Sequence, residues 1–158
     1  MSAHQALRPL PFPLPLPLPA APADDVLLDW AEPLQGARVL VVGHGALDLI
    51  CGLIRRGCTA ATEIQAHCRL APDADSADLM LVPHVESLAD GRAAIGWAVR
   101  ALVMGGRIAV RDASGGRLRP ELAALLRTYG FCRVRTHARP DGVVLTAERP
   151  IFGPLHRG

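Results

Sequence analysis

Residues 39–49 read VLVVGHGALDL, an apolar run that breaks into Gly-x-Gly and then continues without a third glycine. The run before Gly43 has the length and the Val and Leu content of a buried strand. After the glycines, Leu47, Ile50 and Ile54 recur at the spacing of an amphipathic helix. The stretch therefore predicts a strand that ends in a glycine loop and leads directly into a helix.

The rest of the chain continues this alternation. Helices are predicted at residues 24–34, 46–56, 87–103 and 119–131, and strands at 37–43, 58–64, 77–85, 107–113 and on either side of a turn at Pro140-Asp141-Gly142. The helix at 87–103 is predicted to end at Gly105-Gly106, and residues 66–77 are too short and too polar for both a full helix and a strand. This order predicts a layered α/β domain that closes with a hairpin.

Length and charge indicate one domain. The chain has 158 residues, half of them apolar, and a net charge of +2, which is too small to predict nucleic-acid binding. All 17 basic residues are Arg, and the absence of Lys and Asn excludes both as catalytic residues. Residues 1–99 carry six Arg and eleven acids (−5), and residues 100–158 carry eleven Arg and four acids (+7). We interpret this as a solvated Arg-rich surface, with a basic face near an anionic substrate as the alternative.

The cysteines predict neither a disulfide framework nor a metal site. They are Cys51, Cys58, Cys68 and Cys132. Without a C-x-x-C pair or His at zinc spacing, they are expected to be reduced thiols of a cytoplasmic protein. No run approaches the roughly 20 apolar residues that span a bilayer, so no membrane segment is predicted.

A proline-rich tail is predicted over residues 1–23. The sequence RPLPFPLPLPLPAAPADD, which begins at Arg8, places Pro at alternate positions, where each one fixes φ and removes a donor. An extended polyproline II segment is expected, serving as a disordered tether; docking of its prolines into an aromatic groove of a protein partner is the alternative. The domain is expected over residues 24–150, followed by a flexible tail at 151–158.

The order of these elements resembles a class I S-adenosylmethionine-dependent methyltransferase over roughly residues 24–149. VLVVGHG looks like the first motif of that family, ADLMLVPHVESLAD its fourth strand, and RALVMGGRIAV its helix, Gly-Gly turn and fifth strand. YGFCRVRTHARPDGVVLTAER is similar to its antiparallel hairpin of sixth and seventh strands. The resemblance implies a Rossmann-like three-layer sandwich with a mostly parallel sheet, shortened around the family's helix B and third strand.

The resemblance also implies S-adenosylmethionine as cofactor, held at the carboxyl ends of the strands. The implied cofactor-binding residues are Gly43, His44, Gly45, Glu63, Val82, Pro83 and His84. The glycines would let the backbone approach the ligand. Glu63 would accept both ribose hydroxyls, and residues 82–84 would lie against adenine or the methyl acceptor. His84 and Glu86 could serve as a base and its orienting carboxylate.

Each of these residues also has an interpretation without a ligand. Gly43 and Gly45 suit a tight strand-to-helix turn, and Glu63 suits a solvated strand end. His44 suits an exposed loop position, and the residues near His84 suit a helix cap.

The sequence departs from the family pattern at three points that touch one site. The pattern asks for an acid at position 41 and a third glycine at position 47, where the chain has Val41 and Leu47. Loss of the acid would weaken binding of the methionine amino group, and Leu47 would crowd the ligand or force another φ. Asp48 could replace the charge only if the loop rearranged. Shortening at 66–77 would remove an edge of the sheet.

Three hypotheses follow. The first, which we adopt, is a methyltransferase acting on a small-molecule acceptor, for which no catalytic residue is assigned. The second is a catalytically inactive relative that serves as a binding or scaffold protein, favoured by the same three departures. The third is a dinucleotide-binding domain, since G-x-G-x-x-G needs only Asp48→Gly; the terminal hairpin argues against it.

Overall fold

The computed structural model describes residues 25–65, 70–140 and 142–152. The expectations for the tail at 1–23 and for residues 153–158 lie outside these ranges. The elements are α1 (Asp25–Ala31), β1 (Arg38–Val42), α2 (Leu47–Arg55), β2 (Ala60–Ile64), β3 (Ala77–Val85), α3 (Leu88–Ala101), β4 (Leu102–Asp112), α4 (Arg119–Thr128), β5 (Cys132–Arg139) and β6 (Gly142–Glu148).

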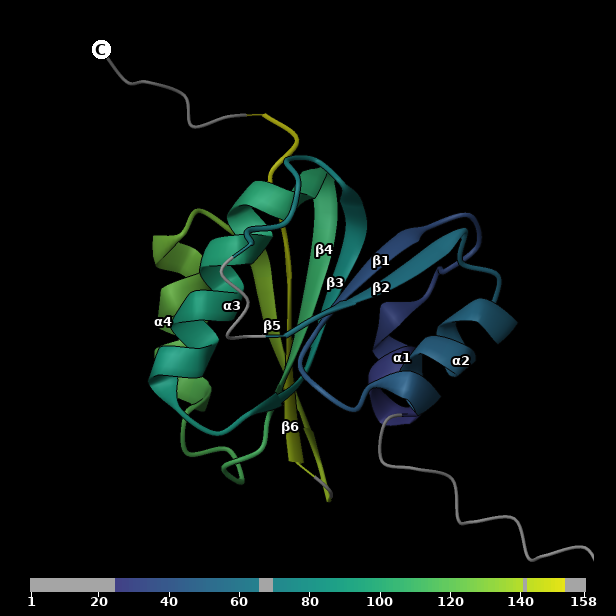
Figure 1. The fold of residues 1–158 in the computed structure, drawn as a ribbon. Coiled ribbons are helices and arrows are strands. Elements are labelled where there is room, and N and C mark those ends of the chain that lie inside the picture. The colour runs from purple at the N-terminus through teal and green to yellow at the C-terminus, as the bar shows by residue number, and fades with distance from the viewer. Residues whose placement is uncertain (1–24, 66–69, 141, 153–158) are drawn as a thin grey trace, which may run out of the picture.

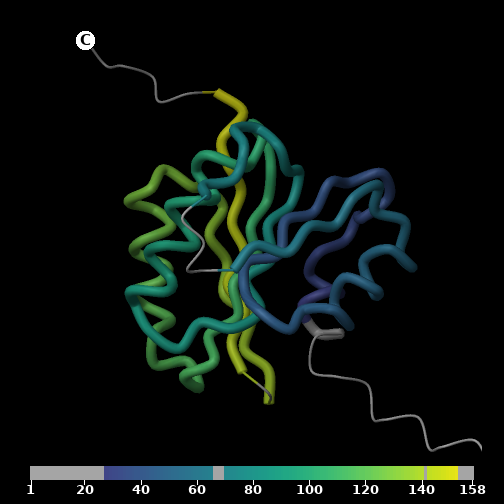
Figure 2. The backbone as a smooth tube through the Cα atoms, in the orientation of Figure 1, coloured from purple at the N-terminus to yellow at the C-terminus, as the bar shows by residue number. Residues whose placement is uncertain are grey.

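The six strands form one sheet in the order β2-β1-β3-β4-β6-β5. The pairs from β2 to β4 are parallel, while β6 runs antiparallel to both β4 and β5. Helices α1 and α2 lie on one face and α3 and α4 on the other (Figure 1). The backbone trace shows the same division, with the purple and blue helices α1 and α2 on one side of the sheet and the teal and green helices α3 and α4 on the other (Figure 2). The predicted three-layer sandwich with a C-terminal antiparallel hairpin is confirmed.

The predicted shortening between the second and third strands is also confirmed for the described residues. Among residues 70–76, no helix or strand forms, and β3 begins at Ala77. As a result β2 is an edge strand, paired only with β1 within the described residues.

One predicted boundary is wrong. The helix expected to reach Gly105-Gly106 ends at Ala101, and β4 begins at Leu102. Hydrogen bonds to the residue that follows β6 hold this backbone in the sheet. Gly105 N donates to Arg149 O at 3.0 Å, and Arg149 N donates to Gly106 O at 2.7 Å. The two glycines therefore form an irregular part of a strand, with Gly105 at φ +77°, instead of a turn after a helix.

The sheet separates two apolar clusters, one on each face. Leu40, Met80 and Ile108 face α3 and α4. Val41, Leu81 and Ala109 face α1 and α2. Central strands buried on both sides have no polar face, which explains why their sequences are continuous apolar runs.

The C-terminal end of α1 is joined to the sheet by one side chain. The Arg107 guanidinium on β4 donates to the carbonyl oxygens of Ala31, Glu32 and Pro33. Beside this contact, the Trp30 ring stacks on His137 of β5 with ring centroids 3.6 Å apart. These contacts fix α1 across β3 and β4, although the helix has only seven residues.

The two glycines of α3 provide a matched test of its packing. A Cβ on Gly91 would lie 2.4 Å from Cδ2 of Leu122, a fully buried residue of α4, whereas a Cβ on Gly96 would meet no atom within 4 Å. Both changes to Ala gain about 1 kcal/mol of helix propensity. Overpacking should leave Gly91→Ala about 1–3 kcal/mol less stable than Gly96→Ala in urea unfolding. Equal stabilities would contradict the close helix contact.

His137 provides a pH test of the Trp30 contact. Burial, followed by the charges of Arg135 and Arg139, lowers the pKa of His137 below its usual value of 6.5. The unfolded chain therefore binds the proton at a higher pH than the folded chain. The lowered pKa of His137 therefore contributes to the free energy of unfolding. This contribution is complete above about pH 6.5, the usual pKa of His, and is lost as the pH falls through the lowered pKa. The stability of the wild type relative to His137→Gln should thus decrease in urea unfolding below about pH 6.5; a pH-independent difference would contradict the shift.

Candidate functional site

A cavity of about 490 Å³ opens at the carboxyl ends of β1 and β3, beside the first half of α3. The chain leaves β1 toward β2 on one side and enters β4 from β3 on the other, so this is the point where the strand order reverses. Open α/β sheets bind ligands at such a point. Two further cavities, of about 540 and 580 Å³, lie elsewhere, so position and not size distinguishes this one.

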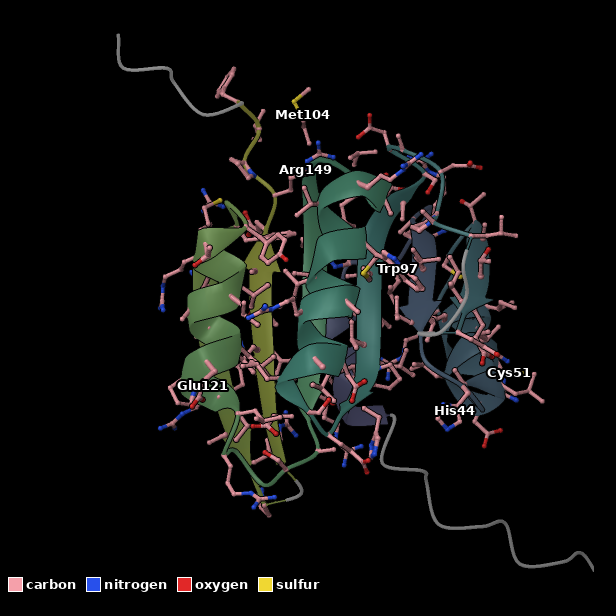
Figure 3. The ribbon with its side chains drawn as sticks, turned by 60° about the vertical axis from the view of Figure 1, so that its left-hand side comes forward. His44, Cys51, Trp97, Met104, Glu121 and Arg149 are labelled. Atoms are coloured by element: carbon pink, nitrogen blue, oxygen red, sulfur yellow. The ribbon has the colours of Figure 1, made fainter. Side chains whose placement is uncertain are left out.

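Six of the seven residues expected to bind a cofactor meet in this cavity. They are Gly43, His44, Gly45, Val82, Pro83 and His84. They come from two segments about forty residues apart, which the β1–β3 pairing places side by side. Figure 3 shows His44 at the end of the sheet opposite Met104 and Arg149.

The loop after β1 favours glycine at position 45 and tolerates a Cβ at position 43. Gly43 N donates to Ile64 O at 2.9 Å, and a Cβ on Gly43 would lie in ordinary contact with Pro83, 3.5 Å from its Cγ. Gly45 has φ +71°, a conformation that favours glycine, and a Cβ there would enter open space. The helix α2 then begins at Leu47, with no side chain capping its N-terminus. Its first backbone N–H groups therefore lack a side-chain acceptor.

The fold accommodates two of the three departures from the family pattern, Val41 and Leu47. Val41 is fully buried in the cluster under α1 and α2, so an apolar side chain is what this position needs here. Leu47 is 69% exposed and does not line the cavity. Its φ is not positive, because the described non-glycine residues with positive φ are Asp75 and Arg133. Leu47 therefore has no left-handed backbone conformation and lies outside the lining of this cavity.

Glu63 is the expected residue that the structure does not bring to this cavity. It pairs with Val41 in the parallel register of β1 and β2, is half-buried, and lines the separate cavity of about 540 Å³ along the β2 edge. Asp48 does not line the glycine-loop cavity either.

The cavity instead holds two carboxylates, one directly after β3 and one in the first turn of α3. His84 Nε2 lies 2.7 Å from Glu86 Oε1, and both side chains are more than half exposed. Asp90 N donates to Ser87 Oγ at 3.2 Å, and Ser87 Oγ donates to Asp90 Oδ2 at 2.6 Å. This capping arrangement fixes the Asp90 carboxylate in the first turn of α3.

Asp90 and Arg111 are lining residues that the sequence argument missed. A signal was available for Asp90, because Ser87-x-x-Asp90 before an apolar run is a helix-start pattern. Arg111 comes near the end of the buried strand β4, at the edge of the sheet where β1 and β3 also end. The cavity thus combines two histidines, two carboxylates and one guanidinium.

Neither a metal cluster nor a membrane-spanning helix is found among the residues that the structure describes. Within residues 25–65, 70–140 and 142–152, no group of three or more His, Cys, Asp or Glu side chains could hold a metal ion. No helix in the part of the chain that the structure describes has the length and apolarity to cross a membrane.

Comparison with known proteins identifies relatives by structure and not by sequence. No protein-family model and no curated protein matches this chain. Among solved structures, a SAM dependent methyltransferase from Aquifex aeolicus is 14% identical with a TM-score of 0.64, over 80% of this chain and 89% of that one. The S-adenosylmethionine-dependent methyltransferase SibL, in its apo form, is 20% identical with a TM-score of 0.59, over 81% of this chain and 55% of that one.

An O-methyltransferase family protein from Burkholderia thailandensis is 14% identical with a TM-score of 0.59, over 82% of this chain. The present chain spans 55% of SibL and 56% of the Burkholderia protein, little more than half of each. At these identities the likeness concerns the fold: the chain has the fold of class I S-adenosylmethionine-dependent methyltransferases.

Restoring the family acid should damage this protein. Val41→Asp would place a carboxylate in an apolar cluster with no partner and should lower the free energy of unfolding by about 3–5 kcal/mol, as an uncompensated buried charge does. Val41→Thr keeps the shape and should cost about 1–3 kcal/mol. Urea unfolding near neutral pH measures both, and an Asp variant as stable as the wild type would contradict the burial of this position.

Proposed function

We propose that this chain binds S-adenosylmethionine in the cavity at the ends of β1 and β3 and acts as a methyltransferase on a small-molecule acceptor. The observation that carries the proposal is the meeting of the glycine loop with residues 82–84 at the strand-order reversal. A volume of about 490 Å³ falls within the range of small-molecule and cofactor sites. The methyltransferase fold of the chain supports the same assignment.

The residues present fit this cofactor in the following way. Gly43 and Gly45 present backbone without side chains, so a ligand can approach the loop closely. Glu86 and Asp90 supply carboxylates for a positively charged amino group, in place of the absent acid at position 41. Val82 and Pro83 supply an apolar wall. When bound, the cofactor would supply an electrophilic methyl group; the protein supplies position and exclusion of water.

We assign His84 the role of proton acceptor for an acceptor molecule that carries a proton. In the neutral tautomer of His84 that has its proton on Nε2, the ring donates to Glu86 Oε1, 2.7 Å away. Nδ1 then carries the free lone pair and can take the proton that the acceptor loses on methylation. Glu86 would stabilise the resulting imidazolium.

A second candidate function is a binding or scaffold protein without catalysis. One observation favours it: neither β1 nor β2 brings an acid to the cavity, since position 41 is a core valine and Glu63 lines another cavity. A protein of this kind could keep the sheet and lose the cofactor.

Calorimetric titration with S-adenosylmethionine and S-adenosylhomocysteine tests the proposal. We expect dissociation constants in the range of about 1 μM to 1 mM. Gly45→Trp should weaken binding at least tenfold (~1.4 kcal/mol), because the indole enters the cavity. Gly130→Trp is the matched control: Gly130 also has positive φ and open space for a Cβ, but it precedes β5 at the opposite edge.

The outcomes separate the two functions. Binding that Gly45→Trp abolishes and Gly130→Trp preserves supports the cofactor site and justifies a screen of acceptors. Absence of heat up to about 1 mM ligand, from protein with an intact circular dichroism spectrum, would overturn cofactor binding and favour the scaffold function.

A further inference from the structure

The open side of the C-terminal hairpin carries a row of basic side chains. Arg135, His137 and Arg139 alternate along β5 and pair with Thr146, Val144 and Gly142 of β6. Val144 belongs to the core cluster on the α1 and α2 side, so the three β5 side chains share that face of the sheet. Helix α1 packs over β3 and β4 and α2 over β2, which leaves Arg135 and Arg139 exposed on this side of the edge strand β5 (Figure 1).

A bulge adds another arginine to the same row. The pairing of Cys132 with Glu148 and of Arg135 with Thr146 leaves one extra residue on β5, and Arg133 takes φ +52° there. Arg133 therefore lines the same shallow cavity as Arg135 and His137. Arg107 of β4 also lines it, with its guanidinium engaged by the carbonyl oxygens at the end of α1. We call these five residues, Arg107, Arg133, Arg135, His137 and Arg139, the basic sheet face.

Little negative charge offsets the basic sheet face. Glu148 is the one carboxylate among the described residues that line its cavity, and its Oε2 lies 3.0 Å from Arg133 Nη1. The acids at the nearby end of α1, Asp29 and Glu32, lie within 3.4 Å of Arg56 of α2 instead. The positive charges of Arg135 and Arg139, which flank His137 on the same face of β5, also lower the pKa of His137, after the larger effect of burial.

Flat rings accompany the charges. Trp30 and His137 are stacked at an interplanar angle of 23°, and the Arg139 guanidinium carbon lies 5.6 Å from the Trp30 ring centroid. Guanidinium and ring planes of this kind are the surfaces on which unpaired bases stack. Arg135, His137 and Arg139 follow an extended strand, in which every second residue is about 6.6–6.8 Å further on, and Arg133 lies at the bulge that precedes them, so the face offers several cations along one line.

We propose that the basic sheet face binds single-stranded nucleic acid. The arginine row contacts successive phosphates, and a base stacks on the Trp30, His137 and Arg139 group. An acidic peptide would satisfy the charges alone, whereas a nucleic acid also presents base planes to the exposed Arg139 guanidinium, so nucleic acid is the occupant that fits both features. The proposal does not depend on cofactor binding, since the residues of this face do not line the glycine-loop cavity.

Fluorescence anisotropy of the full chain with a labelled oligonucleotide of about 12 nucleotides, as oligo(U) and oligo(dT), tests this. We expect binding that weakens steeply from about 50 to about 200 mM salt. The double variant Arg135→Gln/Arg139→Gln should bind at least tenfold more weakly, with a salt slope shallower by about 1.4, because two phosphate contacts are lost at about 0.7 each. Arg135→Gln alone should produce about half of that slope change.

The control is Arg119→Gln/Arg127→Gln. It removes the same charge from exposed positions on α4, which covers the opposite face of the sheet, and it should retain wild-type affinity. Equal weakening by the two double variants would reduce the effect to net charge and overturn the proposal. Absence of binding at about 50 mM salt would also overturn it. Equal affinity for an oligo-glutamate of the same length would overturn it in favour of an acidic protein partner.

Discussion

The parallel pairing of β1 with β3, through Val39–Leu79, Leu40–Met80 and Val41–Leu81, is the constraint on which the remaining structure depends. It sets two segments that are distant in the chain against each other, and burial on both faces holds their register. Because β1 connects outward to β2 and β3 to β4, their carboxyl ends leave a gap between the two halves of the sheet. Strand order therefore places the glycine loop and residues 82–84 together at that gap.

The sequence predicts most of this architecture because its dominant signals are local. Continuous apolar runs, glycine after a helix and the Pro140-Asp141-Gly142 turn each identify an element from a few residues. The end of α3 was not predicted because Leu102 favours a helix and Val103 a strand, so local preference does not decide; the strand is set by the pairing of Leu102 with Ala77 and of the Gly105-Gly106 backbone with Arg149. Such long-range hydrogen bonds leave no periodicity in the sequence.

The sequence also predicted where most residues of the candidate site lie. Six of the seven expected residues lie together because their positions follow from strand ends. Glu63 was placed by analogy with a family, and the register of an edge strand could not be inferred from its sequence. The basic sheet face could not be predicted from the net charge of +2. A net charge is a sum over the chain and carries no information on which side of a strand each residue lies, although four arginines share this face.

The contact of Arg107 with α1 also bears on the order of folding. One guanidinium satisfies three carbonyl oxygens at the end of a helix that lies more than seventy residues earlier in the chain. During synthesis, α1 emerges before β4, so its C-terminal carbonyls obtain this partner only after β4 has been made. A seven-residue helix is too short to persist alone in water. Helix α1 is therefore among the last elements to reach its final packing, and because it takes part in no strand pairing its release would leave the sheet paired.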